Sequence, residues 1–568
     1  MKLTSLKRFV EQYSLDARIK LGQPKTSWQL CLLAIIGGVC SASLIVLFTW
    51  CINSIQGLFL EDVDNYNSLN ASSRLLLPIG GAVIILLFAR MTGYQYTRTG
   101  IPFVLHRLKV AYGVIPLRNT VNQFFGGMVA LASGFSVGKE GPAVHLGAAI
   151  SGYIGKALVL PYNSVRTLCA CGVAAGIAAC FNTPIAAVVF VMEVVLREYK
   201  VHMFIPIMLA AIIGSMMTSS IFGFSHEFEF FSRISLETAH YPVLLIFGVV
   251  LGTLASLFNR YIVMIIEHFQ HVHIFKRFMS VAIITGIIGV MLPQALGTDL
   301  GAISVSLSNE WHFSLLFALL ISKCLLTIVA IGCGIPGGII GPILGIGAIA
   351  GAFTASMISG FVPGENLTSD FALMGMAGFM AATLNAPLAA LLAVVELSHQ
   401  LDIMLPAMIV ISASCLAAGQ FFNNRSVFVM QLNVQNLAYR KPPLENTLQR
   451  IGVLGMMDSS FDMICSAQKE PNIKGNETTG KPLIMRKSVE EQNEYYWNEE
   501  IKSEGEERRI RQHKLIPITS KETLAEAYWL LKESRCGGVY IYDTDPNQIL
   551  GIITFDRIRT YLIEGKLY

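Results

Sequence analysis

Long apolar stretches recur along the chain from about residue 28 to residue 420, and glycine or proline interrupts many of them. Most of these stretches are long enough to cross roughly 30 Å of hydrocarbon as helices. The pattern predicts a polytopic helical membrane protein with apolar runs at 30–50, 75–90, 204–222, 242–258, 279–292, 314–332, 371–397 and 405–420.

The pattern changes after about residue 432, where Glu, Lys, Arg and Asn become frequent. Residues 466–513 are polar enough to favour loops or disorder. From residue 514 onward a helix capped at Thr523, the strands "GVYIYD" and "ILGIIT" and a last helix predict a small α/β unit. We therefore expect four parts: an N-terminal segment (1–27), a membrane domain (28–432), a linker (433–513) and an ordered tail (514–568).

Composition and charge agree with a membrane protein and narrow its functions. The chain is 53% hydrophobic and 14% charged, and its net charge of +4 is too small to indicate a nucleic-acid partner. The first 27 residues are basic and lack an apolar core, which excludes a cleaved signal peptide and predicts a cytoplasmic N-terminus. The eleven cysteines have no metal-site spacing, and no nucleophile–base pair indicates an enzyme.

Two segments of the membrane domain are repeated. "AACFNTPIAAVVFVMEV" (178–194) matches "AATLNAPLAALLAVVEL" (381–397), and "VGKEGPAVHLGAAIS" (137–151) matches "GGIIGPILGIGAIAG" (337–351) in nearly the same frame. Duplicated halves with broken helices are typical of transport proteins that have a central site. An organic-solute symporter could also be built in this way.

The stretch "SGFSVGKEGPAVHLGAAISG" (133–152) places Lys139 and Glu140 among glycines inside this apolar domain. Glycine and proline in both halves predict helices that begin inside the protein, and helix N-termini offer N–H groups and a partial positive charge to an anion. The pattern thus indicates an anion pathway. A carboxylate at Glu140 can occupy a site built for an anion, although a simple capping role is the alternative.

The motifs "TGIP" (99–102), "GKEGP" (138–142) and "GGIIGP" (337–342) resemble, in this order, those of the CLC family of chloride channels and chloride/proton exchangers. The resemblance covers about residues 30–432. It implies an all-α membrane fold of two inverted repeats with tilted and broken helices. It also implies a homodimer with one anion pore in each subunit.

The resemblance assigns roles residue by residue. Glu140 resembles the gating glutamate of the family. The anion-binding positions are Thr99, which stands where a serine is usual, Lys139, Gly141, Gly338, Ile339, Ile340 and Phe428. Arg98 replaces a motif glycine, and we have no account of this change.

Two departures concern the mechanism. Val194 stands where many exchangers carry an inner proton-transfer glutamate, and Glu193 precedes it. Phe428 stands where a tyrosine usually coordinates the anion, so one hydrogen-bond donor is lost. The valine favours passive, channel-like chloride permeation gated by Glu140. The alternative is a chloride/proton antiporter with a substitute inner proton site, such as Glu193 or water.

The tail at 514–562 resembles a CBS motif, a module that pairs into adenine-nucleotide sensors. Asp556 comes one residue early in "GIITFDRIR", and no partner motif is evident before residue 514. We therefore expect a structural or dimer-contact role for the tail rather than nucleotide binding. We expect no other cofactor, a lipid bilayer, chloride and in the alternative protons as partners, both termini in the cytoplasm, and a plasma (inner) membrane location.

Overall fold

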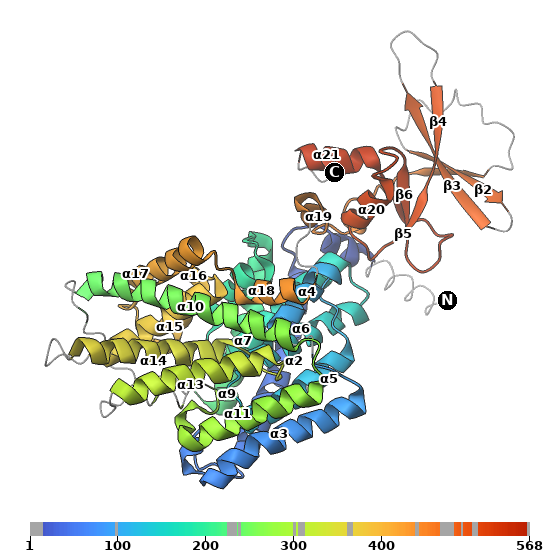
Figure 1. The fold of residues 1–568 in the computed structure, drawn as a ribbon. Coiled ribbons are helices and arrows are strands. Elements are labelled where there is room, and N and C mark those ends of the chain that lie inside the picture. The colour runs from blue at the N-terminus through green and yellow to red at the C-terminus, as the bar shows by residue number, and fades with distance from the viewer. Residues whose placement is uncertain are drawn as a thin grey trace. The chain divides into compact units, whose positions relative to one another are not determined.

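A computed structural model describes the fold of the chain (Figure 1). It describes residues 15–96, 100–223, 236, 240–298, 301, 303–304, 313–359, 367–437, 442–465, 482–489, 492–501 and 509–564. The chain divides into two compact units. The membrane unit comprises Cys31–Ile154 and Arg166–Arg440, and the tail unit comprises Met1–Leu30, Gly155–Val165 and Lys441–Tyr568.

The membrane domain is helical, as predicted. Within the described ranges, nine helices are long and apolar enough to cross a membrane. The first half contains α2 (Trp28–Gln56), α3 (Ala71–Thr92), α4 (Gly100–Val110), α5 (Leu117–Ala132), α6 (Glu140–Ala157), α7 (Tyr162–Phe181), α8 (Pro184–Phe190), the π-helical turn η2 (Val191–Leu196) and α9 (Val201–Phe222). The second half contains α10 (Tyr241–Phe269), α11 (Ile274–Met291), α13 (Phe313–Gly332), α14 (Ile340–Ser359), α15 (Thr368–Leu384), α16 (Pro387–Ser398), α17 (Met404–Leu416), the π-helical turn η5 (Ala417–Phe421) and α18 (Val427–Val434). Three 3-10 turns complete the described elements: η1 (Tyr66–Ser68), η4 (Pro293–Ala295) and, in the tail, η6 (Val453–Gly455).

The apolar run expected at 371–397 is two helices rather than one. Asn385 ends α15 in the left-handed conformation with a φ of 54°, and Pro387 begins α16. Asn182 has a φ of 56° in the other half, and Pro184 begins α8 in the same way. The repeated Asn-x-Pro sequence breaks both helices because asparagine tolerates the left-handed region and proline fits a first helical turn.

Glycines let the central helices of each half pack closely. Gly147 of α6 faces Gly172 of α7, and a Cβ on either residue would overlap the carbonyl oxygen of the other. Gly347 of α14 and Gly375 of α15 make the equivalent contact, and Figure 1 shows α14 beside α15. Small residues allow such close backbone approach inside membranes. The two matching contacts lie about two turns into α6 and α14, and they hold those two helices in the protein interior.

The tail contains more strand than the sequence indicated. A four-stranded sheet has the order β1–β2–β3–β4, with β1 and β2 parallel and the other pairs antiparallel. A three-stranded sheet has the order β5–β6–β7, with β5 and β6 parallel and β6 and β7 antiparallel. The elements are α19 (Pro443–Leu448), β1 (Asp462–Cys465), β2 (Leu483–Val489), β3 (Gln492–Ile501), β4 (Arg509–Lys514), β5 (Ile516–Thr519), α20 (Leu524–Leu531), β6 (Gly538–Tyr542), β7 (Gly551–Thr554) and α21 (Phe555–Glu564).

The expected linker at 433–513 therefore needs correction. Its polar composition favoured loops, but β2, β3 and β4 pair with one another and bury Ile484 and Tyr495. The residues of α19 and of the turn after it pack into the same core as α20 and β6. The predicted order of helix, strand, strand and helix from Thr523 onward is confirmed, but the strand β5 before it was not predicted. Thr523 and Glu526 form a capping box at α20.

The helical residues 15–22 belong to the tail unit, where Arg18 forms an ion pair and Gly22 accepts the backbone N–H of Gly452 at 2.9 Å. Arg18 donates to both carboxylate oxygens of Asp543, at 2.9 and 3.1 Å, and to Oγ of Ser520 at 2.8 Å. The hydrogen bond from Arg18 holds the pKa of Asp543 below its ordinary value, and the bond from Ser520 acts in the same direction. A carboxyl group whose pKa is lower in the folded state stabilises the folded state at pH values above its unfolded-state pKa. This stabilisation is lost as the pH falls through the folded-state pKa.

We therefore expect acid to weaken the attachment of residues 15–22 within the tail unit, although the hydrogen bonds to Leu21 and Gly22 remain. Hydrogen exchange of the full-length protein should show their protection falling as pH drops below about 4. Asp543→Asn should lower that protection already at neutral pH and remove its pH dependence. Asp556→Asn, at an exposed carboxylate of α21, is the control and should behave as the parent protein. Equal pH profiles for the parent and Asp543→Asn would contradict this role.

Candidate functional site

The N-terminal segments of α6 and α14 meet inside the membrane unit. Gly138 and Gly338 lie just before these helices and pair as an isolated antiparallel bridge. The N–H of Gly138 donates to the carbonyl of Gly338 at 2.8 Å, and the N–H of Gly338 donates to the carbonyl of Gly138 at 2.7 Å. The repeat alignment pairs these same two residues. Two helix ends with partial positive charge therefore converge at one place.

The Glu140 carboxylate lies at the helix end of the opposite half. Its side chain is 0% exposed, and its Oε1 accepts the N–H of Gly341 at 2.8 Å. Gly341 belongs to the first turn of α14, where N–H groups have no intrahelical partner. Glu140 thus occupies a position suited to an anion, and it contacts the second half although it begins a helix of the first.

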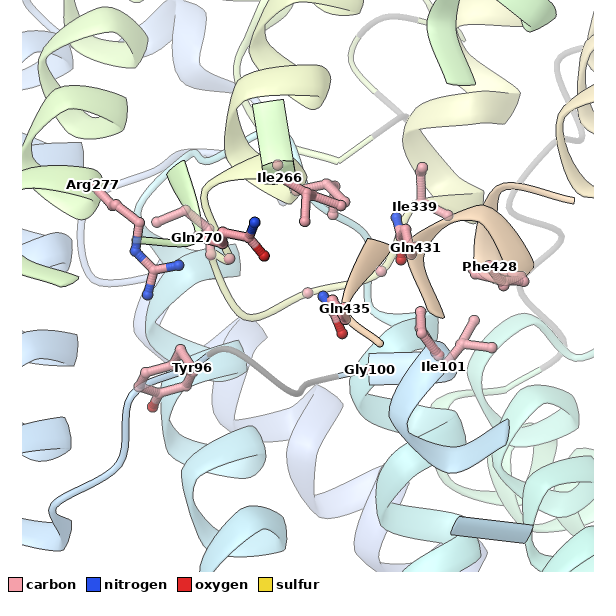
Figure 2. Close-up of a pocket in the computed structure, with 17 residues that line it drawn as sticks. Tyr96, Gly100, Ile101, Ile266, Gln270, Arg277, Ile339, Phe428, Gln431 and Gln435 are labelled. Carbon is pink, nitrogen blue, oxygen red and sulfur yellow. The ribbon is translucent and has the colours of Figure 1, made fainter. Parts of the chain in front are cut away.

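A cavity of about 230 Å³ leads toward this point (Figure 2). It is bounded by the start of α4, the end of α10, the start of α11, the segment before α14, and α18. Gly338, Ile339 and Phe428 line it, so three of the predicted anion-binding residues share one space. The other lining residues are Tyr96, Gly100, Ile101, Pro102, Ile266, Gln270, Arg277, Ile331, Gly332, Gly334, Ile335, Gly337, Gln431 and Gln435.

The remaining predicted anion-binding residues lie differently. Ile340 is buried but does not line this cavity. Gly141 packs so closely on Gly337 that a Cβ would lie 2.5 Å from its carbonyl oxygen. The ammonium group of Lys139 lies 5.5 Å from the ring centroid of Phe181. The last predicted anion-binding residue, Thr99, lies outside the described residues, as does its neighbour Arg98.

Glu193 and its repeat partner Glu396 each cap the N-terminus of a helix in the other half of the membrane domain. The Glu193 carboxylate accepts the N–H groups of Leu388, at 3.3 Å, and Ala389, at 2.7 Å, in the first turn of α16. The Glu396 carboxylate accepts two N–H groups in the first turn of α8, from Ile185 at 3.0 Å and Ala186 at 2.8 Å. Carboxylates that accept orphan N–H groups stabilise a helix N-terminus. The two glutamates therefore have the same structural role as helix caps.

Val194 is 2% exposed and follows Glu193 in η2. Its hydrocarbon side chain cannot hold a proton, and it lines none of the cavities that we describe. A proton station near this position would therefore need Glu193 to leave α16, or water to enter.

The reciprocal caps allow a matched test of Glu193. Glu193→Gln and Glu396→Gln should each weaken one helix cap and lower stability by a similar amount, about 1 kcal/mol. Thermal unfolding in detergent measures this loss. Both variants should keep the same ratio of protons to chloride moved in vesicles. Loss of proton movement in Glu193→Gln alone would instead make Glu193 a proton station.

The sequence did not point to the three carboxamide side chains and the guanidinium group of the cavity. Gln431 and Gln435 follow Phe428 at spacings of three and seven, which place all three on one face of α18. That spacing was a usable signal. Gln270 ends α10 and Arg277 lies in the first turn of α11, and neither position has a motif. Their convergence depends on how α10 and α11 pack.

Comparison with known proteins gives the same fold. A family model described as "Voltage gated chloride channel" matches residues 80–419. The H(+)/Cl(-) exchange transporter ClcA of Citrobacter koseri is 28% identical over 437 residues, covering 72% of this chain and 89% of the relative. The protein of the same name from Vibrio campbellii is 28% identical over 330 residues, covering 56% and 69%.

Solved structures also resemble this chain. A slow cyanobacterial Cl⁻/H⁺ antiporter has a TM-score of 0.64 and 21% identity, covering 72% of this chain and 98% of that structure. A CLC-type fluoride/proton antiporter has a TM-score of 0.59 and 23% identity, covering 71% and 97%. A eukaryotic CLC transporter has a TM-score of 0.58 and 17% identity, covering 93% and 98%. The helix N-termini that meet at Gly138 and Gly338, the fold and the family match over 80–419 together establish that this multi-pass membrane protein belongs to the CLC family.

Proposed function

We propose that the protein moves chloride across a membrane in exchange for protons, with Glu140 as the gate. The observation that carries this proposal is the hydrogen bond between the Glu140 carboxylate and the N–H of Gly341. A helix N-terminus holds small anions well. The side chain and a permeating anion therefore compete for one position.

Protonation couples this competition to pH. A charged carboxylate accepts the Gly341 N–H strongly, because hydrogen bonds to ionised acceptors are stronger than those to neutral ones. A protonated carboxyl group loses much of this attraction and yields its position to an anion. The carboxyl group can therefore carry a proton when it leaves and can displace an anion when it returns.

The names of the relatives favour exchange over the channel-like permeation that the sequence favoured. Both curated relatives are named as H(+)/Cl(-) exchange transporters. Passive permeation is the second candidate, because Val194 is apolar and Glu193 is engaged at α16. In the exchange mechanism, the inner proton route then uses water; a released Glu193 is the alternative that the Glu193→Gln variant tests.

The anion site that we propose lies between the two halves of the membrane domain. The N–H groups of Ile339 and Ile340 precede or begin α14, so neither has an intrahelical partner there. Thr99 would add its hydroxyl, and Phe428, which lines the cavity, would turn its ring edge toward the anion. Lys139, Gly141 and Gly338 belong to the two helix ends that frame the gate.

An imposed chloride gradient distinguishes the two candidates. Purified protein in sealed vesicles should drive protons uphill when chloride runs down its gradient, and a pH electrode follows the protons while a chloride electrode follows the anion. Chloride movement without uphill protons would replace exchange by passive permeation. Absence of any chloride movement would overturn both.

A homodimer is part of this proposal. The capped ends of α8 and α16 expose the apolar side chains of Ile185, at 59%, and Leu388, at 50%, beside the carboxylates of Glu396 and Glu193. Carboxylates facing lipid are costly, and a second copy of the chain covering this face removes that cost. Mass measurement of the detergent-solubilised protein should give twice the chain mass.

We further propose cytoplasmic termini in a plasma (inner) membrane, in line with the basic N-terminal segment. The tail then has a structural role rather than a nucleotide-binding one.

A further inference from the structure

Another cavity of the membrane unit lies where three membrane helices begin or end. Its volume is about 570 Å³, within the range of roughly 300–1,000 Å³ that is typical of sites for small organic molecules. It is bounded by the C-terminal half of α3, the segment between α3 and α4, and the turn between α10 and α11. All three of α3, α10 and α11 are long and apolar enough to cross a membrane, so the cavity lies toward one surface of the bilayer.

One wall of this cavity is an apolar stripe of α3. Val83, Leu86 and Leu87 line the cavity, and Arg90 follows them on the same face of the helix, so that the stripe is about 10 Å long. Leu87 is 58% exposed, and Phe275, which lines the cavity from the start of α11, is 54% exposed. Exposed apolar side chains on membrane helices face lipid, and Figure 1 shows α3 and α11 side by side. The dimer face that we propose is formed by α8 and α16, so a second copy of the chain leaves this cavity open to lipid.

The polar end of the cavity is cationic. Arg90 in the last turn of α3 and Arg277 in the first turn of α11 both line it, and no carboxylate is among the described residues that do. The guanidinium group of Arg90 forms no hydrogen bond or ion pair with another described residue. Arg277 is 5% exposed, its Nη2 donates to the carbonyl of Gln95 at 3.0 Å, and its Nε has no hydrogen-bond partner in the described chain. A buried cation without a counter-charge is costly, and an anionic group in the cavity lowers that cost.

The N-terminus of α11 adds neutral donors to this end of the cavity. Nδ1 of His273 accepts the N–H of Phe275 at 3.3 Å, so Nε2 of the neutral ring carries the proton and can donate it in a hydrogen bond. The N–H of Ile274, which begins α11 and lines the cavity, has no intrahelical partner. A helix N-terminus also carries a partial positive charge that favours phosphate.

We propose that this cavity binds an anionic phospholipid. Its phosphate lies between Arg90, Arg277 and the N-terminus of α11, and its acyl chain lies along Val83 and Leu87. The planar fork of N–H donors on arginine matches the geometry of phosphate. Basic pockets between membrane helices are suited to the head groups of anionic lipids. Free phosphate has no chain to cover the apolar stripe, and a neutral lipid has no net charge to balance the two arginines.

The lipid site adjoins the anion pathway. Gln270 and Arg277 line both this cavity and the smaller cavity beside α18, in which Figure 2 shows their side chains. A phosphate bound to Arg277 therefore contacts a residue that also faces the pathway. Lipid binding does not require chloride movement, so the site stands or falls separately from the proposed exchange.

Lipid binding to the full-length protein tests the proposal. Native mass spectrometry in detergent should show that the protein retains phosphatidylglycerol in preference to phosphatidylcholine, which has the same chains but no net charge. Arg90→Gln should weaken phosphatidylglycerol binding by about ten-fold, because it removes charged hydrogen bonds to the phosphate. Arg90 is exposed, so this change should leave folding intact. Arg260→Gln, at an exposed arginine of α10 that does not line the cavity, should bind lipid as the parent protein does.

A change in the apolar wall tests the place of the acyl chain. Leu87→Trp should fill the space beside the stripe and also weaken phosphatidylglycerol binding. Leu76→Trp is the control, at a leucine of the same helix that is 62% exposed and does not line the cavity.

Four results would overturn the proposal. The parent protein could bind the two lipids equally, or Arg90→Gln could bind phosphatidylglycerol as well as the parent does. Equal losses in Leu87→Trp and Leu76→Trp would indicate the general lipid coat of a membrane protein rather than this cavity. Displacement of phosphatidylglycerol by an equal concentration of glycerol phosphate would indicate a site for free phosphate.

Discussion

Replacing Glu140 with alanine should raise chloride flux and remove its pH dependence, and uphill proton movement should stop. The side chain that competes for the Gly341 N–H is then gone. A hydrogen bond to a charged group contributes roughly 1.5–3 kcal/mol, so freeing this position should favour anion entry by about ten-fold or more. Vesicle flux measured from pH 4 to pH 8 shows the effect directly. In the parent protein, flux should increase as pH falls because protonation releases the carboxyl group.

Glu140→Gln serves as the isosteric counterpart. It removes the charge and the proton-binding site but keeps the shape, so proton movement should be lost and the pH profile should flatten. Glu61→Gln, at an exposed carboxylate between α2 and α3, is the control and should keep both flux and coupling. A pH profile unchanged in Glu140→Ala would show that another group gates the pathway.

The sequence repeat predicted more of this site than the secondary-structure pattern did. The alignment of Gly138 with Gly338 placed the two segments in equivalent positions, and the structure joins them by two hydrogen bonds. The sequence pattern did not predict the partner of Glu140, whose carboxylate accepts the N–H of Gly341 in the second half. Which N–H group the side chain reaches depends on how the two halves pack, and a sequence pattern does not encode that packing.

Other features depended on contacts between distant elements. Arg277 and Gln431 come from helices far apart in the chain, and only packing shows that they share a cavity. The strands β2, β3 and β4 were missed because their polar composition resembles that of a loop. Their stability comes from pairing with one another and from a few buried residues such as Tyr495. Composition is a good guide to apolar membrane helices and a poor one to polar strands.

Replacing Gly138 with alanine should open the pathway without removing the gating glutamate. A Cβ at Gly138 would overlap the Glu140 carboxylate, and its nearest atoms are the two oxygens and the Cδ of that flexible side chain. The carboxylate can move away, so the added Cβ should displace the gating side chain rather than distort the backbone. We expect chloride flux to rise toward the level of Glu140→Ala and proton coupling to weaken.

The repeat supplies a contrast at Gly338. A Cβ there would overlap the backbone N of Gly141 as well as the Glu140 carboxylate, so Gly338→Ala should distort the helix junction and lower stability. Gly80→Ala in α3, where a Cβ meets no atom within 4 Å, is the control for a glycine replacement in a membrane helix.

A double variant that combines Gly138→Ala with Glu140→Ala tests whether the Gly138 substitution acts through the Glu140 side chain. If the Cβ works by displacing the carboxylate, adding Gly138→Ala to Glu140→Ala should change flux no further, since the group being displaced is already absent. Additive effects would mean that Gly138→Ala disturbs the bridge to Gly338 itself. Because Glu140→Ala also relieves one of the overlaps at Gly338 but leaves the overlap with Gly141, it should not rescue the stability of Gly338→Ala. The two glycines are equivalent in the repeat, and they should differ in function because only the first half carries the glutamate.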